Sequence, residues 1–232
     1  MLTTCSETPL RASVLLSMLG AEFAVAVAVP KRVNDQLFPE ELWHIARAVE
    51  KRQAEFGTAR VCARRALAQL GIAPCPLVPN ADRSPSWPSG IAGSISHTQG
   101  CCAVAVTNSP HVAGVGLDLE LDVPLYPELE RMICRPAERL WLDGCDREKR
   151  GWLGKLFFSA KEAFYKCQYQ TTRTLLDFRD VELDIDLESG RFSAVEITRH
   201  GTQWDLVRHA IGKFRCEPGL IVTTAVLNPE EQ

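Results

Sequence analysis

The sequence lacks an excess of positive charge, and it lacks long apolar runs. Its 26 basic residues are outnumbered by 29 acidic ones, and a net charge of −3 provides no general attraction to nucleic acid or to an anionic membrane. The stretch from Arg11 to Pro30 has the order of a signal peptide, but Glu22 interrupts its apolar part. No run reaches the ~18 apolar residues of a membrane span. We expect a cytoplasmic protein with no nucleic-acid partner and no strong membrane affinity.

The cysteines lack the spacing of a zinc site or of a disulfide framework. Their number, nine, is odd, and no two stand in a C-x-x-C pattern. Cys62 lies among alanines, and Cys101 and Cys102 precede an Ala-Val-Ala-Val run, so these thiols should act as small hydrophobic side chains. A reducing compartment fits this pattern. The full set is Cys5, Cys62, Cys75, Cys101, Cys102, Cys134, Cys145, Cys167 and Cys216.

Composition indicates a globular protein with a real core. Hydrophobic residues make up 46% and charged residues 24%, which excludes disordered and fibrous classes. A chain of 232 residues suits one large domain or two halves of ~110 residues.

The first half of the chain alternates strand and helix patterns. Residues 39–70 have helical periodicity that ends before Gly71, with a possible division into two helices near Gly57. Residues 73–90 form a proline-rich loop around Trp87. Strands are predicted at 23–29, 93–97, 101–107 and 112–121.

The second half also mixes both kinds of element. The apolar spacing predicts a helical region at 127–142 and a strong helix at 151–170. Strands are predicted at 181–187, 193–199 and 220–227, the first two joined by a turn at 188–190. Because no regular βαβ repetition occurs, we predict an α+β fold of two similar-sized lobes, 1–111 and 112–232.

The segment GVGLDLE at 114–120 places two carboxylates on one side of a strand. Side chains alternate along a strand, so Asp118 and Glu120 point the same way while the leucines enter the core. Two adjacent carboxylates repel one another unless a cation joins them, and oxygen-only ligands suit Mg²⁺. A solvated edge strand is the alternative. The same three letters recur at Asp186-Leu187-Glu188, where an acidic stripe of period two indicates a solvent-exposed face.

The segment FSAKEAFYK at 158–166 places charges among aromatic side chains on a predicted helix. Glu162 and Lys166 are four residues apart and share a helical face, where they could form a simple surface pair. The surrounding aromatics instead suggest a partly buried cluster. Buried charges need partners, which a metal for Glu162 and phosphates for Lys161 and Lys166 would provide.

Two further patterns could bind phosphate. In GSISH at 93–97, a small-residue strand ends at His97, which is either a phosphate donor or a surface residue at a turn. Arg52, Arg60 and Arg64 lie at multiples of four on the first long helix, so their guanidinium groups share one stripe. This stripe suits a multiply charged phosphate ligand, or it is a solvated basic face.

Taken together, four segments in this order resemble the 4′-phosphopantetheinyl transferase superfamily. Within it, the chain is most similar to the monomeric, two-lobed surfactin-type group and to the branch of enterobactin synthase component D. The segments are RQAEFGTAR, DRSPSWPSGIAGSISH, GVGLDLE and FSAKEAFYK. The last two, ~40 residues apart, are the superfamily signature, and the first two mark the branch.

The resemblance implies a fold, a reaction and a set of site residues. The fold would have two pseudo-twofold lobes with coenzyme A in the cleft between them. Asp118, Glu120 and Glu162 would be the magnesium ligands. The remaining contacts to coenzyme A would be phosphate contacts from Lys161, Lys166 and His97, 3′-phosphate contacts from Arg52 and Arg60, and Arg83 in the loop beside the adenosine.

The implied reaction is attack of a carrier-protein serine on the β-phosphate of coenzyme A, with release of adenosine 3′,5′-bisphosphate. Glu162 is the candidate base, directly or through a metal-bound water, and Lys166 would stabilise the leaving group. Peptidyl, aryl or acyl carrier proteins of siderophore, nonribosomal peptide, fatty-acid or polyketide synthesis are the expected partners. A non-catalytic coenzyme A-binding protein is one rival. A different magnesium phosphotransferase is another, although the chain has no G-x-x-x-x-G-K-[ST] motif.

Overall fold

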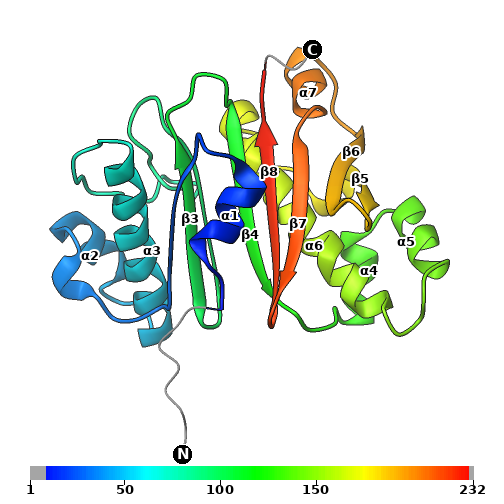
Figure 1. Cartoon of the computed structure of the whole chain (residues 1–232), viewed down its shortest axis with the longest axis horizontal. Coiled ribbons are helices and arrows are strands. Elements are labelled where there is room, and N and C mark those ends of the chain that lie inside the picture. The colour runs from blue at the N-terminus through cyan, green and yellow to red at the C-terminus, as the bar shows by residue number, and fades with distance from the viewer. Residues whose placement is uncertain (1–8, 230–232) are drawn as a thin grey trace, which may run out of the picture. The chain divides into compact units, whose positions relative to one another are not determined.

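The computed structural model describes residues 9–229 of the chain, which form two compact units. Unit 1 ends at Ser109 and unit 2 begins at Pro110, two residues before the predicted boundary (Figure 1). Each unit combines an antiparallel sheet with helices, so the predicted α+β class is confirmed. The eight cysteines of the described part are all free, and Cys5 lies outside the described residues.

Unit 1 consists of a three-stranded sheet and the long helix α3 that packs on it. The strand order is β1-β3-β2, and His97 of β2 lies opposite Cys102 of β3. Small residues of α3, including Cys62 and Ala63, pack against Ala24 and Val104, so the helix lies close to the sheet. The elements are α1 (Ala12–Leu19), β1 (Ala24–Ala28), η1 (Asn34–Gln36), α2 (Pro39–Ile45), α3 (Glu50–Gln69), β2 (Ala92–Thr98) and β3 (Cys101–Thr107).

The predicted helix division near Gly57 is wrong. The chain leaves the helix between Ile45 and Glu50, and Gly57 lies inside α3. A Cβ at Gly57 would stand 3.0 Å from a methyl carbon of Val33. The glycine therefore serves close packing against the preceding loop and does not interrupt the helix.

Unit 2 consists of a five-stranded antiparallel sheet with helix α6 packed on β4 and β8 (Figure 1). The strand order is β4-β8-β7-β6-β5. The elements are β4 (Gly114–Leu121), α4 (Pro127–Ile133), α5 (Pro136–Asp143), α6 (Arg150–Thr172), η2 (Phe178–Asp180), β5 (Val181–Asp186), β6 (Arg191–Ile197), α7 (Thr202–Val207), β7 (Ile211–Glu217) and β8 (Leu220–Leu227). Sequence periodicity had not predicted α1, α7 or β7.

The predicted helical region at 127–142 is two helices. Cys134 and Arg135 are extended, with ψ of 134° and 164°, and Pro136 starts α5. A proline disfavours helical conformation in the residue before it, which accounts for the break.

Two glycines let α6 approach β4 backbone to backbone. A Cβ at Gly116 would lie 1.7 Å from the carbonyl oxygen of Ala163, and one at Gly114 would lie 2.4 Å from that of Cys167. No larger residue fits at either position without moving the helix. The glycines of the GVGLDLE segment thus bring the acidic end of β4 close to α6.

A buried glutamate near the start of a short helix links the parts of unit 1. Glu41 is the third residue of α2, directly after Pro39 and Glu40, and its carboxylate accepts the backbone N–H of Phe38 at 3.0 Å. It also accepts the N–H of Leu77 at 2.9 Å and a guanidinium N–H of Arg64, on α3, at 2.6 Å.

Unit 2 repeats this arrangement with a lysine. Glu138 is the third residue of α5, after Pro136, and accepts the backbone N–H of Arg135 at 2.6 Å. It also accepts the N–H of Leu183 at 2.8 Å and bonds to Lys161, on α6, at 2.7 Å. The two x-Pro-x-Glu segments, FPEE and RPAE, are the sequence signal for both buried carboxylates, which the motif search had missed.

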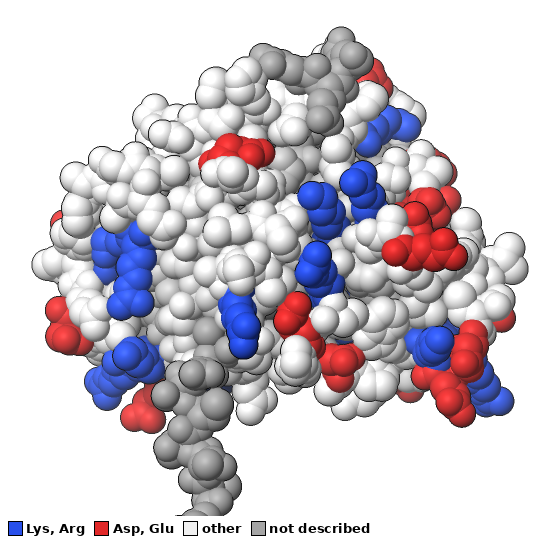
Figure 2. Space-filling model, in the orientation of Figure 1, with Lys and Arg blue, Asp and Glu red and all other residues white. Residues whose placement is uncertain are grey.

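Charge on the surface is mixed in sign. Figure 2 shows basic and acidic side chains scattered over the face that it draws, with opposite charges adjacent at several points. Within residues 9–229, no helix is both long and apolar enough to cross a membrane.

Candidate functional site

The carboxylate of Asp118 is held by side chains of α6. Asp118 is 5% exposed and accepts the Ser159 hydroxyl at 2.9 Å on one oxygen and the Lys166 ammonium at 2.7 Å on the other. Lys166 also donates to the carbonyl oxygen of Leu117 at 3.0 Å. Ser159 lies within 2.9 Å of the Thr223 hydroxyl on β8, which fixes the serine in turn. The acid is therefore oriented before any ligand binds.

Glu120 lies two residues along β4, on the same side of the strand as Asp118. Its carboxylate pairs with the Lys155 ammonium at 3.1 Å. Burial raises the pKa of Glu120, the negative charge of Asp118 raises it further, and Lys155 opposes both effects. The two carboxylates therefore repel each other, as the alternation along the strand predicted.

Glu162 is the third carboxylate of this cluster. Among the described residues, its side chain forms no hydrogen bond and no ion pair. Burial raises its pKa, and the charges of Asp118 and Glu120 act in the same direction, against the opposing charge of Lys166. Glu162 is thus a half-buried acid to which no described residue bonds and whose charge is opposed by the nearby charge of Lys166.

The cluster uses one face of α6. Lys155, Ser159, Glu162 and Lys166 are spaced by four, three and four residues, which places them on one helical stripe. Lys155 and Ser159 had not been predicted. Their spacing from Glu162 was the signal that could have found them.

The donor set fits a magnesium ion in its chemistry. Among residues 9–229, no three histidine, cysteine or acidic side chains are already arranged as a metal site. Asp118, Glu120 and Glu162 nevertheless supply only oxygen donors, and burial together with their mutual repulsion raises the pKa of two of them. Lys155 and Lys166 now carry the compensating charge.

Lys161 does not join this cluster, contrary to its predicted role as a phosphate contact. Its side chain is 1% exposed and its ammonium lies within 2.9 Å of Glu138 and of three carbonyl oxygens. Lys161 stands four residues after Phe157 and three before Phe164, on the apolar face of α6. That spacing was the signal for its burial.

The duplicated tripeptide at 186–188 behaves as predicted. Asp184 and Asp186 of β5 are exposed, while Val181, Leu183 and Ile185 alternate with them and are buried. Hydrogen bonds from the turn residues 188 and 189 to Asp186 lower its pKa. This acid therefore caps a turn on the solvent-exposed face.

In unit 1, the predicted coenzyme A residues line one cavity of about 400 Å³. Arg52 and Arg60 of α3, Arg83 of the proline-rich loop and His97 of β2 all contribute to it. Arg52 lies 3.2 Å from the His97 ring. Arg83 has a φ of 69° and lies in a turn in which its backbone N–H donates to the carbonyl oxygen of Asn80 at 2.9 Å.

Arg60 is the most constrained of these residues. It is 6% exposed, its Nε donates to the carbonyl oxygen of Leu77 at 2.6 Å, and its guanidinium covers the Phe56 ring. Burial lowers its pKa to about 10; the charge of Glu41 opposes this shift, and the charges of Arg52 and Arg64 add to it. A bound anion would stabilise the positive charge of this buried guanidinium. Arg64 completes the predicted stripe, but its guanidinium is bound to Glu41.

Comparison with known families agrees with these two sets of residues. The 4′-phosphopantetheinyl transferase N-terminal domain matches residues 38–107, and the 4′-phosphopantetheinyl transferase superfamily matches residues 114–224. These spans contain every predicted site residue.

Two of the relatives described here are named 4′-phosphopantetheinyl transferases. The chain is 46% identical to 4′-phosphopantetheinyl transferase Svp of Streptomyces mobaraensis, in a match that spans 68% of this chain and 65% of Svp. It is 34% identical to PptT of Mycobacterium tuberculosis over 93% of this chain and 97% of PptT. Enterobactin synthase component D of Escherichia coli is 32% identical over 63% of this chain and 69% of its own.

Among solved structures, the holo-ACP-synthase from Plasmodium yoelii matches 50% of this chain and 94% of its own, at 20% identity and a TM-score of 0.37. This likeness is too low to support an inference.

The chain belongs to the 4′-phosphopantetheinyl transferase superfamily. It is an enzyme that transfers the phosphopantetheine moiety of coenzyme A to a serine of a carrier protein. The predicted family and reaction are confirmed, including the relationship to enterobactin synthase component D.

Proposed function

We propose that Asp118, Glu120 and Glu162 hold the magnesium ion of this reaction. The observation that supports this proposal most strongly is the Glu162 carboxylate, to which no described residue bonds and whose pKa is raised by burial and by two further acids. When bound, the ion would neutralise charge on the diphosphate of coenzyme A. Binding would also replace Lys155 and Lys166 as the source of positive charge at these carboxylates.

Glu162 is proposed as the general base. Among the described residues, no side chain bonds to its oxygens, so a carboxylate oxygen that does not hold the ion remains to accept a proton. The serine oxygen of the carrier attacks the β-phosphorus, and its proton passes to Glu162 directly or through a water. The bond from that phosphorus to the bridging oxygen breaks, and adenosine 3′,5′-bisphosphate leaves.

Lys166 is proposed to contact the phosphates and to stabilise the leaving group. Its side chain is 27% exposed, and its acceptors at Leu117 and Asp118 belong to β4. An ammonium at the rim of the carboxylate cluster can turn from Asp118 to a phosphate oxygen when a cation takes over the aspartate.

The cavity of unit 1 is proposed to bind the adenosine 3′-phosphate end of coenzyme A. Arg60 is held by Leu77 through its Nε, which leaves the other two nitrogens of the guanidinium for a ligand. Arg52 and His97 would add donors to the phosphates, and Arg83 would lie beside the adenosine.

The carrier and the setting are inferred from the relatives. We place the chain in the cytoplasm as a monomer that acts on peptidyl, aryl or acyl carrier proteins. The name of enterobactin synthase component D favours siderophore or other nonribosomal peptide synthesis, while fatty-acid and polyketide carriers are further candidates.

Intact-mass analysis of apo carriers incubated with coenzyme A and Mg²⁺ tests the proposal. The wild-type protein should add phosphopantetheine to at least one carrier. Asp118→Asn should reduce the rate at least ~10²-fold, because an oriented metal ligand is lost. Asp186→Asn alters the same letter in the duplicated tripeptide and should stay within about twofold of wild type. Equal losses in two folded variants would contradict the assignment of the metal ligands.

A further inference from the structure

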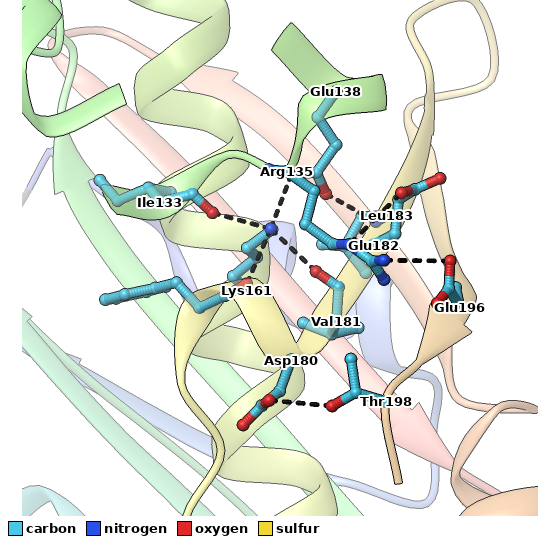
Figure 3. A network of polar contacts seen from close by, with 11 residues as sticks. Ile133, Arg135, Glu138, Lys161, Asp180, Val181, Glu182, Leu183, Glu196 and Thr198 are labelled. Carbon is cyan, nitrogen blue, oxygen red and sulfur yellow. Dashed lines mark hydrogen bonds and ion pairs between the residues drawn. The ribbon is translucent and has the colours of Figure 1, made fainter. Parts of the chain in front are cut away.

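Lys161 lies at the centre of a buried network that ties α6 to four other segments (Figure 3). Its ammonium bonds to the Glu138 carboxylate at 2.7 Å and to the carbonyl oxygens of Ile133, Phe178 and Val181 at 2.8, 2.9 and 2.9 Å. These acceptors come from α5, from the end of α4, from η2 and from the start of β5. The side chain of Lys161 thus connects α6 to α4, α5, η2 and β5.

The network leaves Lys161 no proton for an outside ligand. An ammonium has three N–H donors, and four oxygens already surround this one. Moving it to a phosphate would leave the buried Glu138 carboxylate and three carbonyl groups without their donor. Burial raises the pKa of Glu138 and lowers that of Lys161, which is the direction expected for charges removed from water.

The network adjoins Glu162, the residue that follows Lys161 in α6. Both residues line a cavity of about 190 Å³ whose opposite wall includes Phe178 and Val181. No residue in the described part of the chain bonds to the Glu162 side chain, so the place of its carboxylate depends on the rotation and the axial position of α6. The contact of Gly116, on β4, with the backbone of α6 limits the helix on one side. Lys161 limits it on the side of η2 and β5.

We infer that Lys161 is a positioning residue for Glu162. The inference rests on the proposed function, because it takes Glu162 to be the catalytic carboxylate. Lys161 and Glu138 hold α6 and the 178–181 segment at a set separation, so that the Glu162 carboxylate stays at Asp118 and Glu120. The lysine acts through the helix and touches no substrate.

Unit 1 supplies a matched control for this role. Glu41 is as buried as Glu138, makes the same bond to the N-terminus of its helix, and pairs with a basic residue of the long helix. Glu41 is remote in sequence from the carboxylate cluster, and its link through Leu77 to Arg60 of the proposed coenzyme A cavity should affect the KM for coenzyme A and leave kcat unchanged. A substitution there should disturb stability to a similar degree without moving Glu162.

The experiment compares Lys161→Met, Glu138→Gln, the double variant Lys161→Met/Glu138→Met, and Glu41→Gln. Thermal unfolding and steady-state transfer to a carrier are measured for each at a temperature where the variant is folded. Lys161→Met should lower the Tm by on the order of 10 °C, because it leaves a buried charge unpaired. The double variant should recover most of this loss, since two apolar side chains replace a buried ion pair.

The kinetic result separates positioning from stability. We expect the double variant to keep kcat about 10²-fold below wild type while the KM for coenzyme A changes less than about threefold. Glu138→Gln keeps an acceptor in the network and should fold, with a smaller loss of kcat. Glu41→Gln should keep kcat within about twofold at a comparable loss of Tm.

Three results would overturn the inference. The first is a kcat for the double variant within about twofold of wild type, and the second is an equal loss of kcat in Glu41→Gln. The third is a rise in the KM for coenzyme A as the main effect of Glu138→Gln and Lys161→Met, because that result would restore Lys161 as a ligand. Wild-type protein that modifies no carrier, or full activity of Asp118→Asn, would instead refute the proposed function itself.

Discussion

Replacing Gly116 by alanine would place a methyl group inside the contact between β4 and α6. The new Cβ would stand 1.7 Å from the carbonyl oxygen of Ala163 and 2.9 Å from the backbone nitrogen of Cys167. Both are backbone atoms, so no side chain can turn aside. Since carbon and oxygen atoms rest more than 3 Å apart, α6 must move from β4 by more than about 1 Å.

The size of the effect follows from that displacement. Overpacking a core costs about 1–3 kcal/mol, and this site belongs at the upper end because the obstacle is rigid. A loss of about 3 kcal/mol lowers the Tm by on the order of 10 °C and leaves most molecules folded at 25 °C. The movement also carries Glu162 and Lys166 away from Asp118, and a misplacement of about 1 Å can reduce a rate by about 10²-fold.

The assay pairs thermal unfolding with transfer of phosphopantetheine at 25 °C. Gly144→Ala is the matched control, since Gly144 has a helical φ of −80° and its Cβ would meet its nearest atom at an ordinary 3.4 Å. We expect Gly116→Ala to lose far more activity than its folded fraction explains, and Gly144→Ala to lose neither activity nor stability. A Gly116→Ala protein with wild-type Tm and kcat would refute the account of the β4–α6 contact.

Two further predictions concern the charged groups. Because the pKa of Glu162 is raised in the folded protein, that state binds a proton more readily than the unfolded chain, and the free energy of unfolding falls as pH rises through this pKa. Glu162→Gln should therefore raise the Tm of the metal-free protein at pH 8, with a gain that shrinks toward pH 5; a lower Tm at pH 8 would contradict the shift. Arg60→Ala should raise the KM for coenzyme A at least ~10-fold but hardly change that for 3′-dephospho-coenzyme A, and parallel changes would mean that Arg60 does not contact the 3′-phosphate.

Local patterns determined the strands at 101–107 and 220–227, whose predicted bounds match the structure. The same patterns misplaced the helix break in unit 1 and merged α4 with α5. Periodicity identifies an apolar face but not the point where a chain leaves a helix. In unit 2 that point was decided by the proline at 136, whereas in unit 1 Gly57 packs against Val33 inside a continuous helix. Helix α7 and strand β7 escaped prediction because α7 has only six residues and Gly212 interrupts the strand pattern of β7.

The sequence alone determined the family, the reaction and the acids of the carboxylate cluster. Alternation along β4 was enough to put Asp118 and Glu120 on one side, because the period of a strand is a local property. It also separated this pair from the copy at Asp186, where the period-two acidic stripe indicated solvent.

The tertiary structure decided which lysine of α6 faces the acids. Lys161 directly precedes Glu162 and Lys166 follows it by four residues, and a sequence motif cannot show which of the two lysines faces the acids. Packing against β4 sets the rotation of the helix, which directs Lys166 toward Asp118 and buries Lys161 against Glu138. The partner of a buried charge comes from a distant segment, and only the folded chain brings the two together.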